Sequence, residues 1–215
     1  KDTVINEKNV KIPLYVAAYE TISQWLKDGK YKAGDTSRRH CRKTANDMER
    51  IVKDILSAAR MGGSDFKLER TDLDISRMLQ KACRKVMGRI EDKEMELRQD
   101  IQPDFHYEGD ARLMEKVFAN VLDNAVAYSP RGAVVTVTLQ DGVLSVENSG
   151  IHIEQEDLEQ LFTPFYRVDK SRNRNSGGSG LGLYITKTIL DHHGISYSME
   201  NTENGVRFTA LFRLL

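Results

Sequence analysis

Apolar positions in the first quarter of the chain recur at intervals of three and four residues, the spacing of a helix with one buried face. Residues 12–26 and 38–61 are therefore predicted to be two helices, joined by the Gly-containing link KDGKYKAGD. The apolar residues of the second helix form a heptad seam of the coiled-coil type: Cys41, Ala45, Met48, Val52, Ile55 and Ala59.

A lone two-helix hairpin cannot bury the apolar faces of both of its helices. Two copies that pair into a four-helix bundle would bury them, so we predict a homodimer. Packing of the hairpin on its own downstream domain is the alternative. Gly62, Gly63 and Ser64 interrupt the helical pattern, and we place a domain boundary there, between a hairpin of residues 1–63 and a second domain of residues 64–215.

The second domain mixes helical and alternating patterns. Helices are expected from an N-cap at Asp72 to about Asp92, over 112–128 after an N-cap at Asp110, and over 181–193 before Gly194. Alternating segments predict strands at 94–101, 133–139, 143–148, 195–201 and 206–214.

Two turn signals show how these strands connect. Asp141-Gly142 and Asn204-Gly205 each lie between two predicted strands, which indicates two hairpins. The pattern does not alternate as repeated βαβ units do. We therefore expect an α+β protein: the N-terminal two-helix hairpin, then a sandwich of helices on one face of a mixed, largely antiparallel sheet.

Composition excludes some partners. The chain has 32 Lys and Arg residues and 32 Asp and Glu residues, so its net charge gives no reason to expect nucleic acid or an anionic membrane as a partner. Cys41 and Cys83 lack metal-type spacing and are expected to be reduced and packed. No apolar stretch approaches the ~20 residues that span a bilayer. The chain begins with Lys, so we expect a fragment whose membrane segment, if any, lies upstream.

Two asparagines on the predicted helix 112–128 are candidate ligands. Asn120 and Asn124 are four residues apart, so their amides lie on one helix face, beside the apolar stripe. An amide carbonyl is a hard oxygen ligand of the kind that Mg²⁺ accepts together with phosphate oxygens and water. Taken alone, such a pair is more typical of surface or capping residues.

A second cluster, Asn148-Ser149-Gly150, lies at the end of a predicted strand. A polar side chain beside a glycine that permits close backbone approach suits the amino group of adenine, although a plain turn explains the tripeptide equally well. The aromatic residues of LFTPFYR, at 161–167, either anchor the start of a loop or belong to the core.

The glycine-rich segment 177–182 is the most specific signal. It opens the predicted helix 181–193, where backbone N–H groups without side chains can cradle phosphate. It follows a long polar loop instead of a strand, and no Gly-Lys-Ser/Thr follows it. These features exclude the Rossmann and Walker phosphate-binding loops.

Together the four segments resemble one family. NVLDNAVAYSP, VENSG, LFTPFYRVD and GGSGLGLYITK are similar to the N, G1, F and G2 boxes of two-component sensor histidine kinases, in the same order. The local sequences VENSGIHI and the segment before GLGL are similar to those of vancomycin-resistance-type sensors. The resemblance covers nearly the whole chain and implies the ATP-binding fold of Hsp90, gyrase and MutL.

The resemblance implies ATP and Mg²⁺ as cofactors and assigns roles by position. Asn120 and Asn124 would bind Mg²⁺ and phosphates, Tyr128 would flank the nucleotide, and Asn148 would read adenine. The remaining implied nucleotide-binding residues are Gly150, Arg172, Gly178, Gly180, Leu181 and Gly182. The loop from about 163 to 179 would be a lid over the nucleotide, ordered when nucleotide is bound.

The sequence departs from the family pattern in the nucleotide boxes. Asn148 stands where the G1 box usually has Asp, His152 where it has Gly, and Ala127 where the N box often has a basic residue. An amide carbonyl still accepts a hydrogen bond from the adenine amino group, but it carries no charge. Basic residues of the lid are candidates to compensate: Arg167, Lys170, Arg172 and Arg174.

A further departure concerns the phosphoacceptor. The segment 11–14, KIPL, resembles the end of the H box. Counting back from Pro13 places Lys8 where the phosphorylated His is expected and Asn9 where its acidic neighbour is expected. A protonated Lys cannot accept a phosphoryl group as an imidazole nitrogen can. His40 on the second helix is a weak substitute candidate.

The resemblance and its departures imply three candidate functions. The first is a protein-histidine kinase that relays phosphate to a response-regulator receiver domain, in the cytoplasmic part of a bacterial cell-membrane sensor. The second is a hydrolytic ATPase, but such relatives carry Glu at the position of Asn120, which cannot act as a general base. The third is a non-catalytic or phosphatase-biased scaffold that docks a response regulator, which Lys8 keeps open.

Overall fold

The computed structural model describes residues 3–5, 11–13, 51–63, 65–168 and 179–212. These residues belong to two compact units, one comprising 1–66 with 160–185, the other comprising 67–159 with 186–215. The second unit contains the sheet and most of the helices that cover it.

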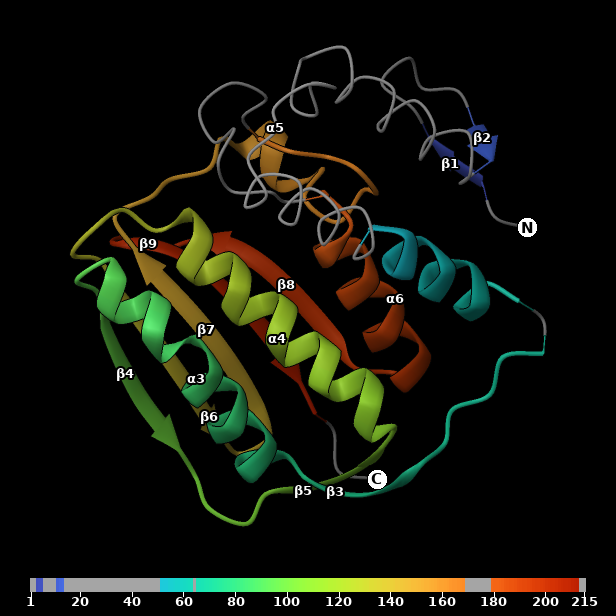
Figure 1. Cartoon of the computed structure of the whole chain (residues 1–215), viewed down its shortest axis with the longest axis horizontal. Helices are drawn as coiled ribbons and strands as arrows, with labels where there is room; N and C mark the ends of the chain where they lie inside the picture. The colour runs from blue at the N-terminus through green and yellow to red at the C-terminus, as the bar shows by residue number, and fades with distance from the viewer. Residues whose placement is uncertain (1–2, 6–10, 14–50, 64, 169–178, 213–215) are drawn as a thin grey trace, which may run out of the picture. The chain divides into compact units, whose positions relative to one another are not determined.

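A five-stranded sheet forms the centre of the second unit (Figure 1). Its order is β4 (Glu96–Ile101), β6 (Val134–Gln140), β7 (Val143–Ser149), β9 (Gly205–Leu211) and β8 (Ser196–Asn201). β4 pairs with β6 in parallel and the other neighbours are antiparallel. The predicted mixed, largely antiparallel sheet is confirmed. The sequence did not reveal that β4 and β6 are joined by a parallel crossover.

Both predicted hairpins are present. β6 and β7 are joined by Asp141 (φ 50°) and Gly142 (φ 76°), two left-handed residues that fit a tight two-residue turn. Strands β8 and β9 flank the second turn, which ends at Gly205. On one sheet face the three central strands present buried apolar side chains, as their alternation predicts: Val135, Val137, Leu139, Leu144, Val146, Val206, Phe208 and Ala210.

Helices cover that apolar face (Figure 1). They are α3 (Ile75–Asp92), α4 (Ala111–Tyr128) and α6 (Gly182–His193), of which the part from Thr186 onward belongs to this unit. The Asp110 side chain caps α4 as predicted, accepting from the backbone N–H groups of Arg112 and Leu113 at 3.1 Å each. A four-residue helix, α5 (Gln155–Leu158), was not predicted.

The predicted cap of α3 was wrong by two residues. Asp74, not Asp72, is the N-cap, and its carboxylate accepts from the backbone N–H of Arg77 at 2.8 Å. Asp72 lies in strand β3 (Thr71–Asp74), which pairs with β5 (His106–Gly109) in a separate two-stranded ribbon. The strand geometry of this ribbon delays the start of the helix.

The first unit departs from the predicted hairpin at its start. Residues 12 and 13 belong to strand β2 (Lys11–Pro13), which pairs with β1 (Thr3–Ile5), so a helix beginning at residue 12 is wrong. The residue before a proline is disfavoured in the helical region, which fits Ile12 in a strand. Residues 51–61 are helical and end before Gly62 and Gly63, as predicted.

Cys83 is fully buried on α3, and burial raises the pKa of its thiol to about 11, in keeping with a packed, reduced side chain. Among the described residues no helix combines the length and apolar character needed to cross a membrane. Most of the predicted hairpin, residues 14–50, lies outside the described residues.

A buried histidine joins the ends of two helices. The side chain of His193, at the end of α6, is 4% exposed. Its Nε2 accepts from the backbone N–H of Asp110 at 3.0 Å. Because Nε2 is the acceptor, the proton of the neutral ring lies on Nδ1, which donates to the Ile189 carbonyl at 2.7 Å. Protonating Nε2 would break the bond to the start of α4.

We predict that His193 makes the fold acid-sensitive. Burial, the largest cause, lowers the pKa of His193 below its ordinary value, and the hydrogen bond to Ile189 opposes this shift. A depressed folded-state pKa gives stability that is present above the unfolded value of about 6.5 and is lost as pH falls through the folded-state pKa. Urea unfolding at pH 7.5 and pH 5 should show a smaller pH effect in His193→Gln than in the unchanged chain. His152→Gln, at an exposed position, is the control and should leave the pH effect as it is.

Candidate functional site

The paired asparagines lie on α4 as predicted. Asn120 and Asn124 are half-buried and one turn apart, beside the fully buried stripe of the helix. The Nδ2 of Asn120 lies 3.4 Å from Oγ1 of Thr186, a buried residue of α6. The side chain of Asn124 makes no hydrogen bond with any residue that the structure describes. Two amide groups thus share one face of α4, which fits an oxygen ligand set for Mg²⁺ and phosphate.

Lys93, the residue that follows α3, fixes the carboxyl end of α4. Lys93 directs its ammonium group at three backbone carbonyls, those of Val126 at 2.7 Å, Ala127 at 3.0 Å and Ser129 at 2.9 Å. Desolvation lowers the pKa of Lys93, and Arg89 adds to this shift. A cation at the negative end of the helix dipole is stabilising. The geometry of this helix end, where Tyr128 is 43% exposed, is therefore well defined.

Asn148 is joined to the same helix end by a chain of two hydrogen bonds. Its side chain is 6% exposed, and Nδ2 donates to Oγ of Ser129 at 3.0 Å. Ser129 in turn donates from Oγ to the Ala125 carbonyl at 2.6 Å. The structure thus connects the predicted adenine reader to the helix that carries the asparagine pair.

Glycines shape the backbone beside Asn148. Gly150 has a φ of 79°, and a Cβ there would lie 2.9 Å from Cγ of Pro130. A Cβ on Gly205 would lie 2.0 Å from the backbone oxygen of Asn148. No side chain fits at either position, so both glycines are required for the close packing of the backbone here.

In the first unit, Gly180 of the glycine-rich segment is hydrogen bonded to the aromatic segment before it. The Phe165 N–H donates to the Gly180 carbonyl at 2.9 Å. Gly180 has a φ of 73°, and a Cβ there would lie 2.7 Å from the Phe165 carbonyl carbon. Leu181 is fully buried, and Gly182 is the first residue of α6. Leu181 therefore anchors this segment, and Gly180 is required by space and by conformation.

Four predicted site residues lie outside the described residues: Lys8, Asn9, Arg172 and Gly178. The same holds for most of the predicted lid and for His40. Among the described residues, no three His, Cys, Asp or Glu side chains are grouped so that they could hold a metal ion. The amide pair on α4 is thus the metal-ligand candidate that the sequence and the structure share.

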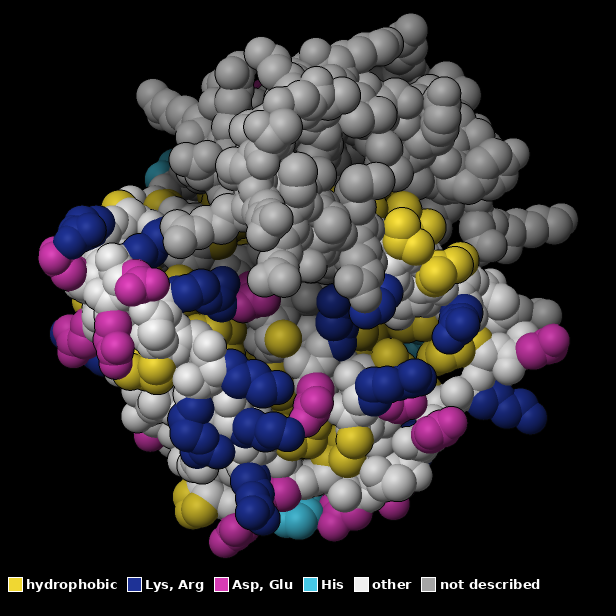
Figure 2. Space-filling view, in the orientation of Figure 1, with side chains coloured by type: hydrophobic (Ala, Val, Ile, Leu, Met, Phe, Trp, Pro, Cys, Tyr) yellow, Lys and Arg dark blue, Asp and Glu magenta, His cyan; other side chains and the backbone are white. Residues whose placement is uncertain are grey.

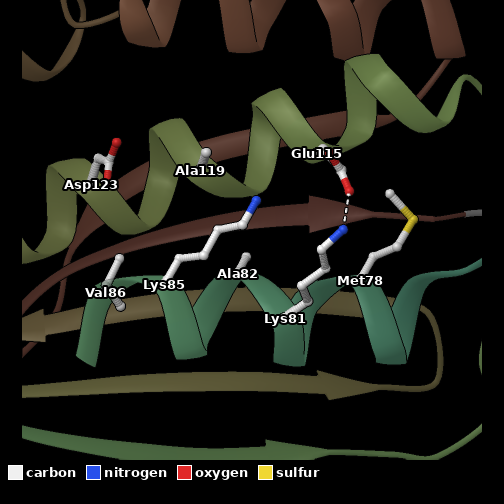
Figure 3. Close-up of a pocket in the computed structure, with 8 residues that line it drawn as sticks. All are labelled: Met78, Lys81, Ala82, Lys85, Val86, Glu115, Ala119 and Asp123. Atoms are coloured by element: carbon white, nitrogen blue, oxygen red, sulfur yellow. Dashed lines mark hydrogen bonds and ion pairs between the residues drawn. The ribbon is translucent and has the colours of Figure 1, made fainter. Parts of the chain in front are cut away.

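A groove of about 230 Å³ lies between α3 and α4 (Figure 3), and neither asparagine of the pair lines it. An ion pair crosses the groove from Nζ of Lys81 on α3 to Oε1 of Glu115 on α4, at 2.9 Å. Arg89 of α3 forms a second ion pair with Asp123 of α4. Lys and Arg side chains gather over these helices, as Figure 2 shows. None of the predicted site residues lines this groove. A substitution in this groove is therefore a suitable control for substitutions in the candidate site.

Residues 109–215 match the family described as histidine kinase-, DNA gyrase B- and HSP90-like ATPase. The chain is 33% identical over 184 residues to the sensor protein VanSB of Enterococcus faecalis, covering 84% of this chain and 41% of the relative. It is 32% identical over 166 residues to the sensor-like histidine kinase SenX3 of Mycobacterium tuberculosis, covering 74% of this chain and 40% of the relative. The chain thus spans about two fifths of the length of these relatives.

Solved structures agree with this match. The catalytic domain of histidine kinase ThkA is 28% identical, with a TM-score of 0.59, and covers 66% of this chain and 95% of that domain. The shared fold is the ATPase fold that the four boxes imply. The chain belongs to the two-component sensor histidine kinases, and its similarity to VanSB is compatible with the vancomycin-resistance-type subfamily.

Sequence reasoning missed three residues that the structure brings to this region. Lys93, Ser129 and Thr186 each contact a predicted site residue or the helix end that carries one. Only Ser129 carried a local signal: a Ser at the end of a helix readily bonds the carbonyl four residues earlier. The other two contacts join segments far apart in the chain, which no local pattern reveals.

Proposed function

We propose that this chain is the catalytic region of a sensor histidine kinase, which binds Mg-ATP and transfers the γ-phosphoryl group to a histidine. The observation that carries the proposal is the connection of two predicted sites through one helix. Asn120 and Asn124 lie along α4, and Asn148 is hydrogen bonded to Ser129 at its end. A nucleotide with its base at Asn148 and its phosphates toward the asparagine pair would lie along this helix.

Each residue then has a distinct role. The amide carbonyls of Asn120 and Asn124 would hold the cation and orient the phosphates, and the carbonyl of Asn148 would accept from the adenine amino group. The exposed ring of Tyr128 would flank the nucleotide. Gly178, Gly180 and Gly182, with Arg172, would line the phosphate side. The bound Mg²⁺ supplies neutralisation of the charge on the transferred phosphoryl group.

Transfer is favoured over hydrolysis by what α4 lacks. A hydrolytic relative needs a carboxylate to activate water, and Asn120 stands where it would lie. An amide cannot remove a proton from water at neutral pH. The catalytic role that remains for the site is to position the phosphoryl group for transfer to a docked side chain. That role fits a kinase.

The second candidate function is a non-catalytic or phosphatase-biased scaffold that docks a response regulator. Lys8 favours it, because the position expected for the phosphoacceptor holds an ammonium group instead of an imidazole. A scaffold of this kind would keep the nucleotide site and lose autophosphorylation. Nucleotide binding and phosphoryl transfer therefore have to be measured separately.

We further propose the assembly in which the activity operates. A hairpin of residues 1–63 would form a homodimer, and residues 64–215 would form the catalytic domain. The partner would be a response-regulator receiver domain, whose aspartate takes the phosphoryl group. Histidine kinase ThkA has been solved in complex with response regulator protein TrrA, which supports this class of partner. The chain would be the cytoplasmic portion of a bacterial membrane sensor.

Replacing Asn124 with Ala is expected to weaken Mg-ATP binding by about 1–3 kcal/mol, the usual cost of losing a polar partner. Calorimetric titration of the whole chain with ATP in the presence of Mg²⁺ measures the difference. Repeating the titration without Mg²⁺ should show a smaller effect of the substitution, because the amide acts partly through the cation.

Glu115→Ala is the matched control, since Glu115 lies on the same helix but faces the groove toward α3 (Figure 3). It removes an exposed ion pair, which is worth at most about 1 kcal/mol of stability, and should leave nucleotide affinity as it is. Equal affinity for ATP in the unchanged chain and in Asn124→Ala would contradict the proposed site.

A further inference from the structure

Ser129 has its hydroxyl proton committed to one partner. Its Oγ lies 2.6 Å from the Ala125 carbonyl oxygen, and a carbonyl has no hydrogen to offer. The proton between these two atoms is therefore the serine's own. Only lone pairs of Oγ then point toward Asn148, and Ser129 can act toward that side chain solely as an acceptor.

This acceptor determines which way the Asn148 amide faces. An Asn side chain has a donor end and an acceptor end of nearly equal shape. Only the NH₂ group can bond to an oxygen that offers lone pairs, so Nδ2 faces Ser129 at 3.0 Å. Oδ1 must then face the other way, and no hydrogen bond reaches it from any residue within the described ranges. Both side chains are buried, at 6% and 4% exposure, so water competes poorly for these bonds.

We propose that Ser129 is a positioning residue that makes the nucleotide site selective for adenine by locking the amide of Asn148. This proposal rests on the proposed function, in which Asn148 reads the base. Adenine presents an amino group, a donor, at its 6-position, and the locked Oδ1 accepts from it. Hypoxanthine and guanine present a carbonyl oxygen there, which would face Oδ1 with no proton between them.

The lock is needed because position 148 holds Asn. A carboxylate at this position would not need its orientation to be fixed. A carboxylate only accepts hydrogen bonds, so it favours the adenine amino group whichever way it turns. A free amide could turn by 180° and donate from Nδ2 to a 6-oxo group. With Ser129 in place, the turned amide would set Oδ1 against the lone pairs of Oγ and leave a buried polar contact unsatisfied, which is costly.

The test compares ATP with inosine triphosphate, which differs at the 6-position of the base. Calorimetric titration of the whole chain should show ATP preferred by roughly 10²-fold, the size expected when a buried polar group is mismatched. In Ser129→Ala the preference should fall by about 10-fold or more, chiefly through tighter binding of inosine triphosphate. Ser129→Thr keeps the hydroxyl and should keep the preference.

A second pair of variants separates locking from a general loosening of the site. Asn148→Asp and the double variant Asn148→Asp with Ser129→Ala should prefer ATP equally, because a carboxylate needs no lock. Should Ser129→Ala fail to fold, hydrogen exchange in the unchanged chain gives an independent measure. The Asn148 side-chain amide proton that faces Ser129 should exchange slowly without nucleotide, because it is already bonded to Oγ of Ser129.

Each outcome has one meaning. An unchanged ATP preference in Ser129→Ala, or rapid exchange of the Asn148 amide proton that faces Ser129, overturns the locking role while leaving the proposed function standing. A loss of preference when Ser129→Ala is added to Asn148→Asp, as large as the loss in the otherwise unchanged chain, also overturns it. If the unchanged chain binds neither nucleotide, the proposed function itself fails. Loss of preference only where Asn148 is retained supports the lock.

Discussion

A chain with Lys8→His is expected to label itself from ATP, whereas the unchanged chain is expected to give only background incorporation. At a pKa of about 10.4, roughly one lysine side chain in 2,500 is neutral at pH 7, whereas most of a histidine with a pKa of about 6.5 is neutral there. The difference in available nucleophile alone predicts an increase of about 10³-fold. Incubation with ATP labelled at the γ-phosphate, in the presence of Mg²⁺, measures it.

Two controls give this result its meaning. Adding Asn124→Ala to the Lys8→His chain should reduce the labelling, which ties the phosphoryl group to the nucleotide site on α4. The label should be lost in acid and survive in base, as expected of a phosphorus–nitrogen bond on an imidazole. Efficient labelling of the unchanged chain would show that another side chain, such as His40, accepts the phosphoryl group. Absence of labelling in the Lys8→His chain that still binds ATP would favour the scaffold.

Elements with a long, regular pattern could be predicted from the sequence. Helix α4 and strands β6 and β7 follow their apolar periods, and Asp110 and Asp141-Gly142 mark a cap and a turn by their chemistry. The ribbon of β3 and β5 could not be predicted, because TDLD and HYEG are four residues long and carry few apolar side chains. Missing that ribbon also misplaced the start of α3.

The same contrast holds for the site. Asn120, Asn124 and Asn148 were found because each belongs to a local motif in a recognisable order. Lys93 and Ser129 act through bonds to residues 33–36 and 19 positions away, respectively, and such contacts depend on how the elements pack. Sequence motifs thus predicted the residues expected to contact the nucleotide. The structure identified the residues that position them through hydrogen bonds.

The predicted dimer seam includes a part that the structure describes, the helix over 51–61. Within this single chain, Ile51, Ala58 and Met61 are buried, whereas Val52 is 49% exposed and Leu56 is 52% exposed. The predicted seam residues Val52, Ile55 and Ala59 thus lie on the more exposed side of the helix. Large apolar groups on that side are available to a second copy, as a four-helix bundle across a two-fold axis requires.

Replacing Val52 with Asp is therefore expected to convert a dimer into a monomer. In the bundle the new carboxylate would be buried without a partner, and the two-fold axis would bring a second one near it, at a cost of several kcal/mol. Light scattering at high micromolar concentration should show the unchanged chain and Lys53→Asp as dimers, because Lys53 is exposed beside the seam.

Circular dichroism and ATP titration should show that residues 64–215 of the Val52→Asp chain stay folded and bind nucleotide. In a chain that also carries Lys8→His, labelling should fall, since the helix that accepts the phosphoryl group loses its partner. A monomeric unchanged chain, or a dimeric Val52→Asp chain, would overturn the seam and with it the bundle.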